Sequence, residues 1–161
     1  MRISFPSYIF LSCMLLTACS CKEKKVADDI PTAPVTEVQT LSYPALTNAV
    51  ITQLYADVEK VDIIFYDLPI SVNQDDAPSA KNTALYISPA SPVITKTCKP
   101  IARLSFISKG SIVHDADVYC DTGCQYLLFM KNNTPVAANA MTQGGIDFFN
   151  NIISQVSKTK Q

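Results

Sequence analysis

The sequence predicts an α+β domain in which a largely antiparallel sheet of five or six strands is combined with a helix near each end of the domain. Two stretches with apolar residues at helical spacing enclose the middle of the domain. Short runs rich in β-branched and aromatic residues lie between these stretches. Glycine or paired asparagines separate the last of these runs, which is typical of hairpins.

The first helix is predicted over residues 44–59. Pro44 suits the first turn of a helix, and the residues that follow place apolar side chains at helical spacing. These side chains are Leu46, Ala49, Val50, Leu54, Val58 and Val61. After this helix we expect a buried strand over 61–67, a surface loop over 69–82 and a short strand over 83–88.

The last helix is predicted to begin after Thr142, a residue type that caps helices well. Its apolar stripe comprises Ile146, Phe149, Ile152, Ile153 and Val156. Both helices have one apolar stripe, and we expect them to pack on one face of the sheet.

Two strands, 101–107 and 111–120, flank Ser108-Lys109-Gly110. A three-residue hairpin loop needs positive φ at its last position, which Gly110 supplies. This loop sets Leu104 opposite His114 and Arg103 opposite Asp115, with the apolar residues on one face. A two-residue Lys-Gly turn would set Leu104 against Asp115, so the three-residue loop is favoured.

The same argument predicts a three-residue loop between Cys120 and Cys124, ending in Gly123. It sets Val118 opposite Tyr126. Asn132-Asn133 then predicts a two-residue turn into a strand over 135–141.

Residues 1–18 have the layout of a secretory signal. Arg2 begins the segment, apolar residues extend to Ala18, and the charged sequence CKEKK follows. The apolar run is shorter than the ~20 residues that a membrane-spanning helix needs.

The four residues Leu16-Thr17-Ala18-Cys19 resemble the lipobox of bacterial lipoproteins. The resemblance implies that the Cys19 sulfur receives a diacylglyceryl group, that cleavage occurs before Cys19, and that the new amino group is acylated. Ser20 follows where aspartate tends to retain such proteins at the inner membrane, which implies the outer membrane of a Gram-negative bacterium. The alternative is an ordinary secreted protein cut after Ala18.

Residues 19–42 are expected to form a lipidated tether, and residues 43–161 a single globular domain in the periplasm. The tether sequence is charged and then rich in Pro, Thr and Val, without a sustained period. Its lysines at 22, 24 and 25 either lie near anionic headgroups or are simply solvated. The near-neutral net charge of −1 gives no nucleic-acid footprint.

A disulfide between Cys98 and Cys120 is predicted, because the first hairpin register places them opposite each other in an oxidising compartment. Cys98–Cys124 is the alternative pairing. Cys120–Cys124 would close so short a loop that it would constrain the unfolded chain least.

No metal site or cofactor is expected. His114 is the only histidine, and a strand that rises ~3.3 Å per residue holds it too far from the cysteines to share an ion. Asp115 and Asp117 share one strand face, and a cross-strand ion pair of Asp115 with Arg103 is expected.

Two functions remain open. The first is a non-enzymatic module that binds an envelope protein or a small ligand through the second sheet face, where apolar and charged residues mix. That face is predicted to contain Ile101, Arg103, Val113, Asp115, Asp117, Tyr119, Leu127 and Phe129. The second is a periplasmic enzyme, either thiol-redox through the clustered cysteines or hydrolytic through Asp115 and Asp117.

Overall fold

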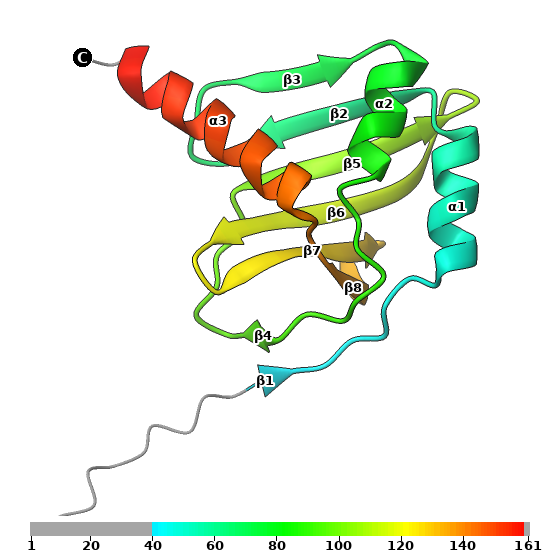
Figure 1. Ribbon diagram of the computed structural model, residues 1–161, viewed down its shortest axis with the longest axis horizontal. Helices are drawn as coiled ribbons and strands as arrows, with labels where there is room; N and C mark the ends of the chain where they lie inside the picture. The colour runs from blue at the N-terminus through cyan, green and yellow to red at the C-terminus, as the bar shows by residue number, and fades with distance from the viewer. Residues whose placement is uncertain (1–39, 160–161) are drawn as a thin grey trace, which may run out of the picture. The chain divides into compact units, whose positions relative to one another are not determined.

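The computed structural model describes residues 40–159, so the predicted signal segment, Cys19 and nearly all of the predicted tether lie outside the described residues. The order of elements is mixed, with helices interrupting the strands (Figure 1). They are β1 Thr40–Leu41, α1 Asn48–Asp57, β2 Lys60–Phe65, β3 Ser71–Gln74, α2 Ala77–Ala84, β4 Ile94–Thr95, β5 Ala102–Ser108, β6 Ser111–Asp121, β7 Cys124–Lys131, β8 Thr134–Ala140 and α3 Gln143–Thr159.

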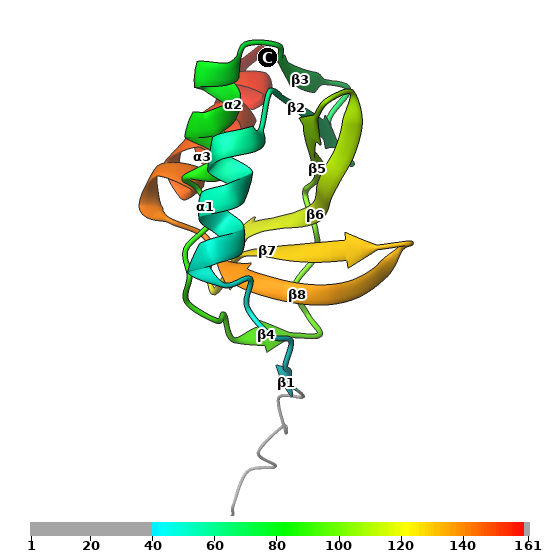
Figure 2. The ribbon, with the colours of Figure 1, turned by 90° about the vertical axis from the view of Figure 1, so that its right-hand side faces the viewer.

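The predicted α+β class is confirmed. Six strands form an antiparallel sheet in the order β3-β2-β5-β6-β7-β8, and β1 pairs with β4 in a separate two-stranded ladder. Figure 2 shows the three helices beside the sheet. One core contains side chains from helices and sheet together, including Leu54 of α1, Leu104 of β5 and Phe149 of α3. Burial alternates strictly along β5, as expected for a strand whose two faces meet different surroundings.

The first helix begins later than predicted. Thr47 caps it by accepting a hydrogen bond from the backbone N–H of Val50 at 3.4 Å, and the helix runs from Asn48. Pro44 instead lies beside β8, where its carbonyl accepts a hydrogen bond from Ala138 N–H at 2.9 Å. The segment before Thr47 therefore extends along the sheet edge rather than adding a helical turn.

The predictions of a loop over 69–82 and a strand over 83–88 were wrong. The first range contains β3 and most of α2, and the second contains the end of α2 followed by a single bridge between Ile87 and Met141. Asp76 caps α2 by accepting a hydrogen bond from Ser79 N–H at 2.9 Å, with Pro78 in the first turn. Asp76 and Pro78, residue types that also favour loops, thus form the start of a helix.

The first hairpin has a two-residue turn, contrary to the prediction, yet the predicted faces are correct. Lys109 and Gly110 both have positive φ, at 49° and 74°, and Ser108 pairs with Ser111. A β-bulge after Phe106 then adds one residue to the β6 side, so that Leu104 faces Ala116 and Arg103 faces Asp117. The turn and the bulge together shift the register by two residues from the prediction, which preserves the parity of the faces.

The second hairpin also has a two-residue turn, Thr122-Gly123, and here no bulge compensates. Asp121 pairs with Cys124, and Val118 faces Leu127 instead of Tyr126. This slip of one residue turns every side chain of β7 to the face opposite to the predicted one. The Asn132-Asn133 turn is as predicted, with φ of 51° and 61° and Lys131 paired with Thr134.

At the end of the domain, Thr142 lies where the prediction places the helix cap, and its carbonyl accepts a hydrogen bond from Ile146 N–H at 3.1 Å. Its hydroxyl does not cap the helix but donates to the Leu85 carbonyl at 3.1 Å. Thr142 therefore ties the start of α3 to the end of α2.

Candidate functional site

The second face of the sheet has two parts with different surroundings. Over β7 and β8, the segment around β4, which pairs with β1, covers this face, and a small second core forms there around Ile94, Tyr126, Leu128 and Ala138. Over β2 and β5, Ile64 and Tyr66 remain 57% and 48% exposed. We call the first part the covered half and the second part, comprising Ile64, Tyr66, Arg103, Asp115 and Asp117, the open half.

A charged network occupies the open half. Arg103 of β5 donates from Nε to Asp115 at 2.8 Å and from a terminal nitrogen to the other Asp115 oxygen at 2.5 Å. Its second terminal nitrogen donates to Asp117 at 3.0 Å. The predicted Arg103–Asp115 ion pair is therefore confirmed, although Asp117 is the direct cross-strand partner of Arg103. Because all three side chains are 14–26% exposed, water only partly screens the network.

Two further hydroxyl groups complete this network. Tyr66, just past β2, donates to Asp117 at 2.6 Å, and Ser105 donates to Asp115 at 3.1 Å. Burial, followed by the hydrogen bond to Asp117, raises the pKa of Tyr66 to about 12. The Asp115 hydrogen bonds, followed by those to Asp117, outweigh burial and raise the pKa of Arg103. Hydrogen bonds among side chains of β5, β6 and the residue just past β2 therefore hold these charges in place.

Sequence reasoning did not identify Tyr66 and Ser105 as part of this site. Tyr66 was assigned to a buried strand, and its position beside Asp117 depends on the β2–β5 pairing, in which Ile64 faces Arg103. No local pattern reports that long-range pairing. Ser105 could have been found from the alternation along β5, since it lies two residues from Arg103 on the same face.

Three predicted members of the binding face are misplaced, and the first of these, Ile101, packs against the main core. Phe129 and Leu127 are 2% and 0% exposed in the main core, on the helix-containing side of the sheet. Their assignment to the second face was wrong because the Thr122-Gly123 turn is one residue shorter than predicted. The vacated positions hold Tyr126 and Leu128, and Tyr119 stacks on Tyr126 at 4.4 Å between ring centroids. Tyr119 therefore borders the covered half.

The predicted Cys98–Cys120 disulfide was also wrong, because β5 begins only at Ala102 and Cys98 lies before it, against the second core. Cys98 is bonded to Cys124, with Cα atoms 5.8 Å apart, and this bond joins the covering segment to β7. Cys124 pairs with Asp121 on the second face, whereas Cys120 points toward the main core. The two-residue turn places Cys124 on the second face, and the alternative pairing, Cys98–Cys124, is the one that forms.

The remaining described thiol, Cys120, is a poor nucleophile. It is buried beside α3, where its sulfur lies 3.8 Å from the Ile146 carbonyl oxygen and 3.7 Å from an Asn150 oxygen. Burial raises its pKa to about 11, and the nearby Asp121 charge adds to the rise. Because thiolate is the reactive form, this environment disfavours thiol chemistry near neutral pH.

The carboxylate pair is likewise arranged for fixed charge rather than proton transfer. Both Asp115 oxygens and one Asp117 oxygen accept hydrogen bonds from Arg103. These hydrogen bonds occupy carboxylate oxygens through which a general acid or base would have to reach a substrate. Among the described residues, no group of three or more His, Cys, Asp or Glu side chains is placed to hold a metal ion.

His114 lies at the end of the sheet and pairs with Phe106, not with Leu104 as predicted. Its ring meets Phe129 edge-on at 6.0 Å, and burial lowers its pKa. It borders a hollow of about 540 Å³ between the β5–β6 and β7–β8 hairpins. Ile112, Val113 and Val136 contribute exposed apolar surface to the same hollow.

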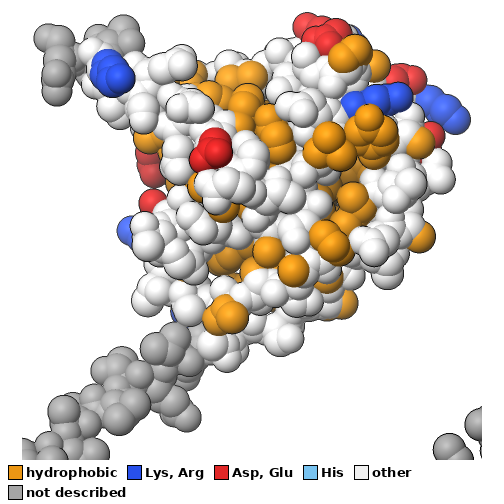
Figure 3. Space-filling model, in the orientation of Figure 1, with side chains coloured by type: hydrophobic (Ala, Val, Ile, Leu, Met, Phe, Trp, Pro, Cys, Tyr) orange, Lys and Arg blue, Asp and Glu red, His pale blue; other side chains and the backbone are white. Residues whose placement is uncertain are grey.

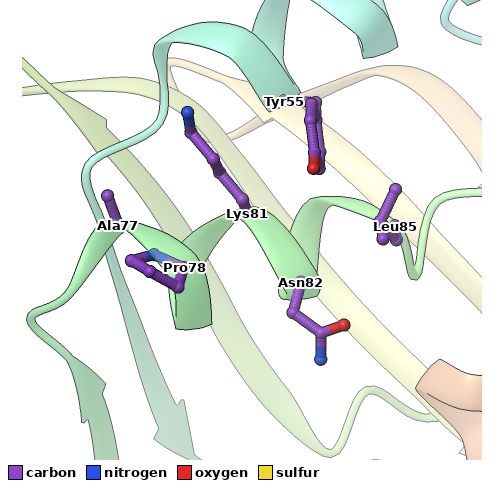
Figure 4. Close-up of a pocket in the computed structure, with 6 residues that line it drawn as sticks. All are labelled: Tyr55, Ala77, Pro78, Lys81, Asn82 and Leu85. Atoms are coloured by element: carbon purple, nitrogen blue, oxygen red, sulfur yellow. The ribbon is translucent and has the colours of Figure 1, made fainter.

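The helix side carries a separate, shallow hollow of about 500 Å³ between α1 and α2. In Figure 4, Tyr55 of α1 and Lys81 of α2 lie near each other, with Pro78 on one side of them and Leu85 on the other. The Lys81 ammonium group lies 5.9 Å from the Tyr55 ring centroid, a cation–π contact. Hydrophobic side chains reach the surface on this side (Figure 3). The hollow offers apolar surface and one cation, but no fixed network like that of the open half.

Comparison with known proteins yields no match to a family model, a curated protein or a solved structure. Within residues 40–159, no helix is both long and apolar enough to cross a membrane. Function must therefore be argued from the geometry of the chain itself.

Proposed function

We propose that this chain is a lipid-anchored protein of the bacterial cell envelope whose domain is a non-enzymatic binding module. In this proposal Cys19 carries the lipid, residues 19–42 form the tether, and the domain lies in the periplasm at the outer membrane. The N-terminal and C-terminal helices pack on one face of the sheet, and the open half of the other face contacts an envelope protein or a small ligand.

The fixed network of Tyr66, Asp117, Arg103 and Asp115 beside exposed Ile64 is the observation that carries the proposal. Exposed apolar side chains rimmed by charge are typical of contact surfaces, and Tyr and Arg are enriched at binding hot spots. Charges that hydrogen bonds already hold in place lose little side-chain entropy on binding. The same bonds engage the carboxylates, which favours recognition over acid–base catalysis.

The binding proposal can be tested by photo-crosslinking in the cells that make the protein. A photoreactive residue at position 64 should give one reproducible adduct, because Ile64 is exposed and lies opposite Arg103 in the open half. The matched control is position 151, where Asn151 is exposed on α3. Identical backgrounds from positions 64 and 151 would contradict the proposal.

The anchoring proposal has a separate test. Cys19→Ser should abolish incorporation of labelled palmitate and leave an unprocessed precursor, because acylation needs the sulfur and cleavage follows acylation. Cys21→Ser, two residues away, is the matched control and should be labelled and processed normally. Normal processing of Cys19→Ser without lipid would show that the Leu16-Thr17-Ala18-Cys19 motif is accidental.

A further inference from the structure

The two long hairpins separate before their ends. The β6–β7 ladder starts at Asp115–Met130, so residues 111–114 of β6 pair with β5 but not with β7. Two bulges lie at this level, one after Phe106 in the first hairpin and one after Phe129 in the second. Bulges bend strands and increase their twist, which accounts for the separation.

The space between the hairpins is a groove lined by both apolar and polar side chains. It is the hollow of about 540 Å³ beside His114, and its walls include Ile112 and Val113 on one hairpin and Val136 on the other. These three side chains are 61%, 45% and 42% exposed. In an antiparallel strand, successive residues direct their backbone N–H and C=O groups to opposite sides. The stretch 111–114 therefore presents backbone hydrogen-bonding groups to the groove.

The outer edges of the sheet are protected, in contrast to this inner edge. Along β8, Ala138 N–H donates to Pro44 at 2.9 Å and Ala140 N–H donates to Ala90 at 2.8 Å. The other edge strand, β3, is only four residues long, is mostly polar and ends beside the Lys60–Asp75 ion pair. Short, charged or covered edges are how proteins prevent unwanted strand pairing. The edge at 111–114 is as short as β3, but it contains two apolar residues and carries no Lys, Arg, Asp or Glu side chain.

Among the described residues that line the groove, Lys131 is the charged side chain without an ion-pair partner. Asp115 also borders the groove, but Arg103 engages both of its carboxylate oxygens. An acidic group on an occupant would complement Lys131.

We infer that the groove binds an extended segment of a partner protein, which adds as a strand beside residues 111–114 of β6. Backbone hydrogen bonds would supply affinity, and alternate apolar side chains would enter the groove. An acidic residue of the segment would pair with Lys131. This surface shares Asp115 with the open half but contains neither Ile64 nor Tyr66, so the inference does not depend on binding at the open half.

The test uses the full lipoprotein in detergent and a displayed library of random linear peptides as the probe. The selected peptides should alternate apolar residues and carry an acidic residue. Ile112→Lys should weaken their binding at least about tenfold, because a lysine on a strand edge opposes pairing. Val93→Lys, at a 71% exposed position outside the groove, is the matched control and should leave binding unchanged.

A charge exchange tests the register of the complex. Lys131→Glu should weaken binding of the acidic peptide about tenfold, and exchanging the peptide's acid for lysine should restore it. Peptide binding should also slow hydrogen exchange at residues 111–114. Failure to select peptides, or binding that Ile112→Lys and Lys131→Glu leave unchanged, would overturn the inference. Concentration-dependent dimers of the protein that Ile112→Lys abolishes would also overturn it, since the occupant would then be a second copy.

Discussion

The covered and open halves of the second sheet face are built from the same strand geometry but held by different forces. In the covered half, Tyr126 is 1% exposed and the Cys98–Cys124 bond fixes the covering segment. In the open half, Tyr66 is 48% exposed and its hydroxyl binds a charged network. The comparison indicates that the first half serves stability, while the second displays fixed groups to the surroundings.

Replacing one tyrosine by alanine in each half should give the largest difference in stability between the two halves. Tyr126→Ala should lower the free energy of unfolding by about 3–5 kcal/mol, since it removes a fully buried ring. Tyr66→Ala should lower it by only about 1 kcal/mol, the net worth of one hydrogen bond. Urea unfolding of both variants measures the difference. Equal losses would show that the open half is as structural as the covered half.

The disulfide should have the next largest effect. Replacing Cys98 and Cys124 by alanine should cost about 3 kcal/mol, because the bond closes a loop with a sequence separation of 26. Urea unfolding with and without reductant measures this cost.

The Cys120 thiol gives a separate prediction. In the wild type, Cys120 is the free cysteine among the described residues, and a thiol reagent should label it only after unfolding. Rapid reaction of the native Cys120 thiol would contradict its burial and its raised pKa.

The charged network should contribute less than the disulfide. Arg103→Met should destabilise the fold by about 1–2 kcal/mol, because Asp115 and Asp117 lose their common partner while water remains near them. The destabilisation should depend on ionic strength, which screens the remaining repulsion between the carboxylates. Unfolding at low and high salt provides the measurement. The same loss at both salt concentrations would show that packing of the arginine stem, and not charge, is responsible.

Replacing His114 should have the smallest effect on stability, and this effect should appear in the pH dependence of unfolding. Burial lowers its folded-state pKa below the ordinary 6.5, so its contribution is present above that value and is lost as the pH falls through the folded-state pKa. His114→Gln should therefore lose less stability than the wild type between about pH 7 and about pH 5. Unfolding of both proteins across that range isolates the histidine from the carboxylates. Parallel pH profiles would contradict the lowered pKa.

The sequence predicted the parts of the fold that local pattern determines. The antiparallel hairpins, the Asn132-Asn133 turn and the faces of β5 and β6 follow from turn residues and alternation. The placement of α2 was missed because Asp76 and Pro78 are equally good signals for a loop and for a helix start.

The largest errors came from a single residue of loop length. Gly123 has positive φ of 79°, which suits the end of a longer loop as well as the two-residue turn that forms. The choice between them inverted β7, so Phe129 was assigned to the wrong face and Cys124 was not placed on the face where Cys98 lies. In the first hairpin, the bulge after Phe106 cancelled the equivalent error. Bulges and long-range strand order leave no local signal, and the Tyr66–Asp117 contact depends on both.

The most direct test of the binding proposal is the shielding of the open half in the native envelope. In a Cys21→Ser background, Ile64→Cys and Asn151→Cys would each be exposed to a small maleimide, in intact cells and after purification. Both positions should react in the purified protein, while position 64 alone should be shielded in cells. Equal labelling of position 64 in cells and in the purified protein would contradict the claim that the open half is a binding surface.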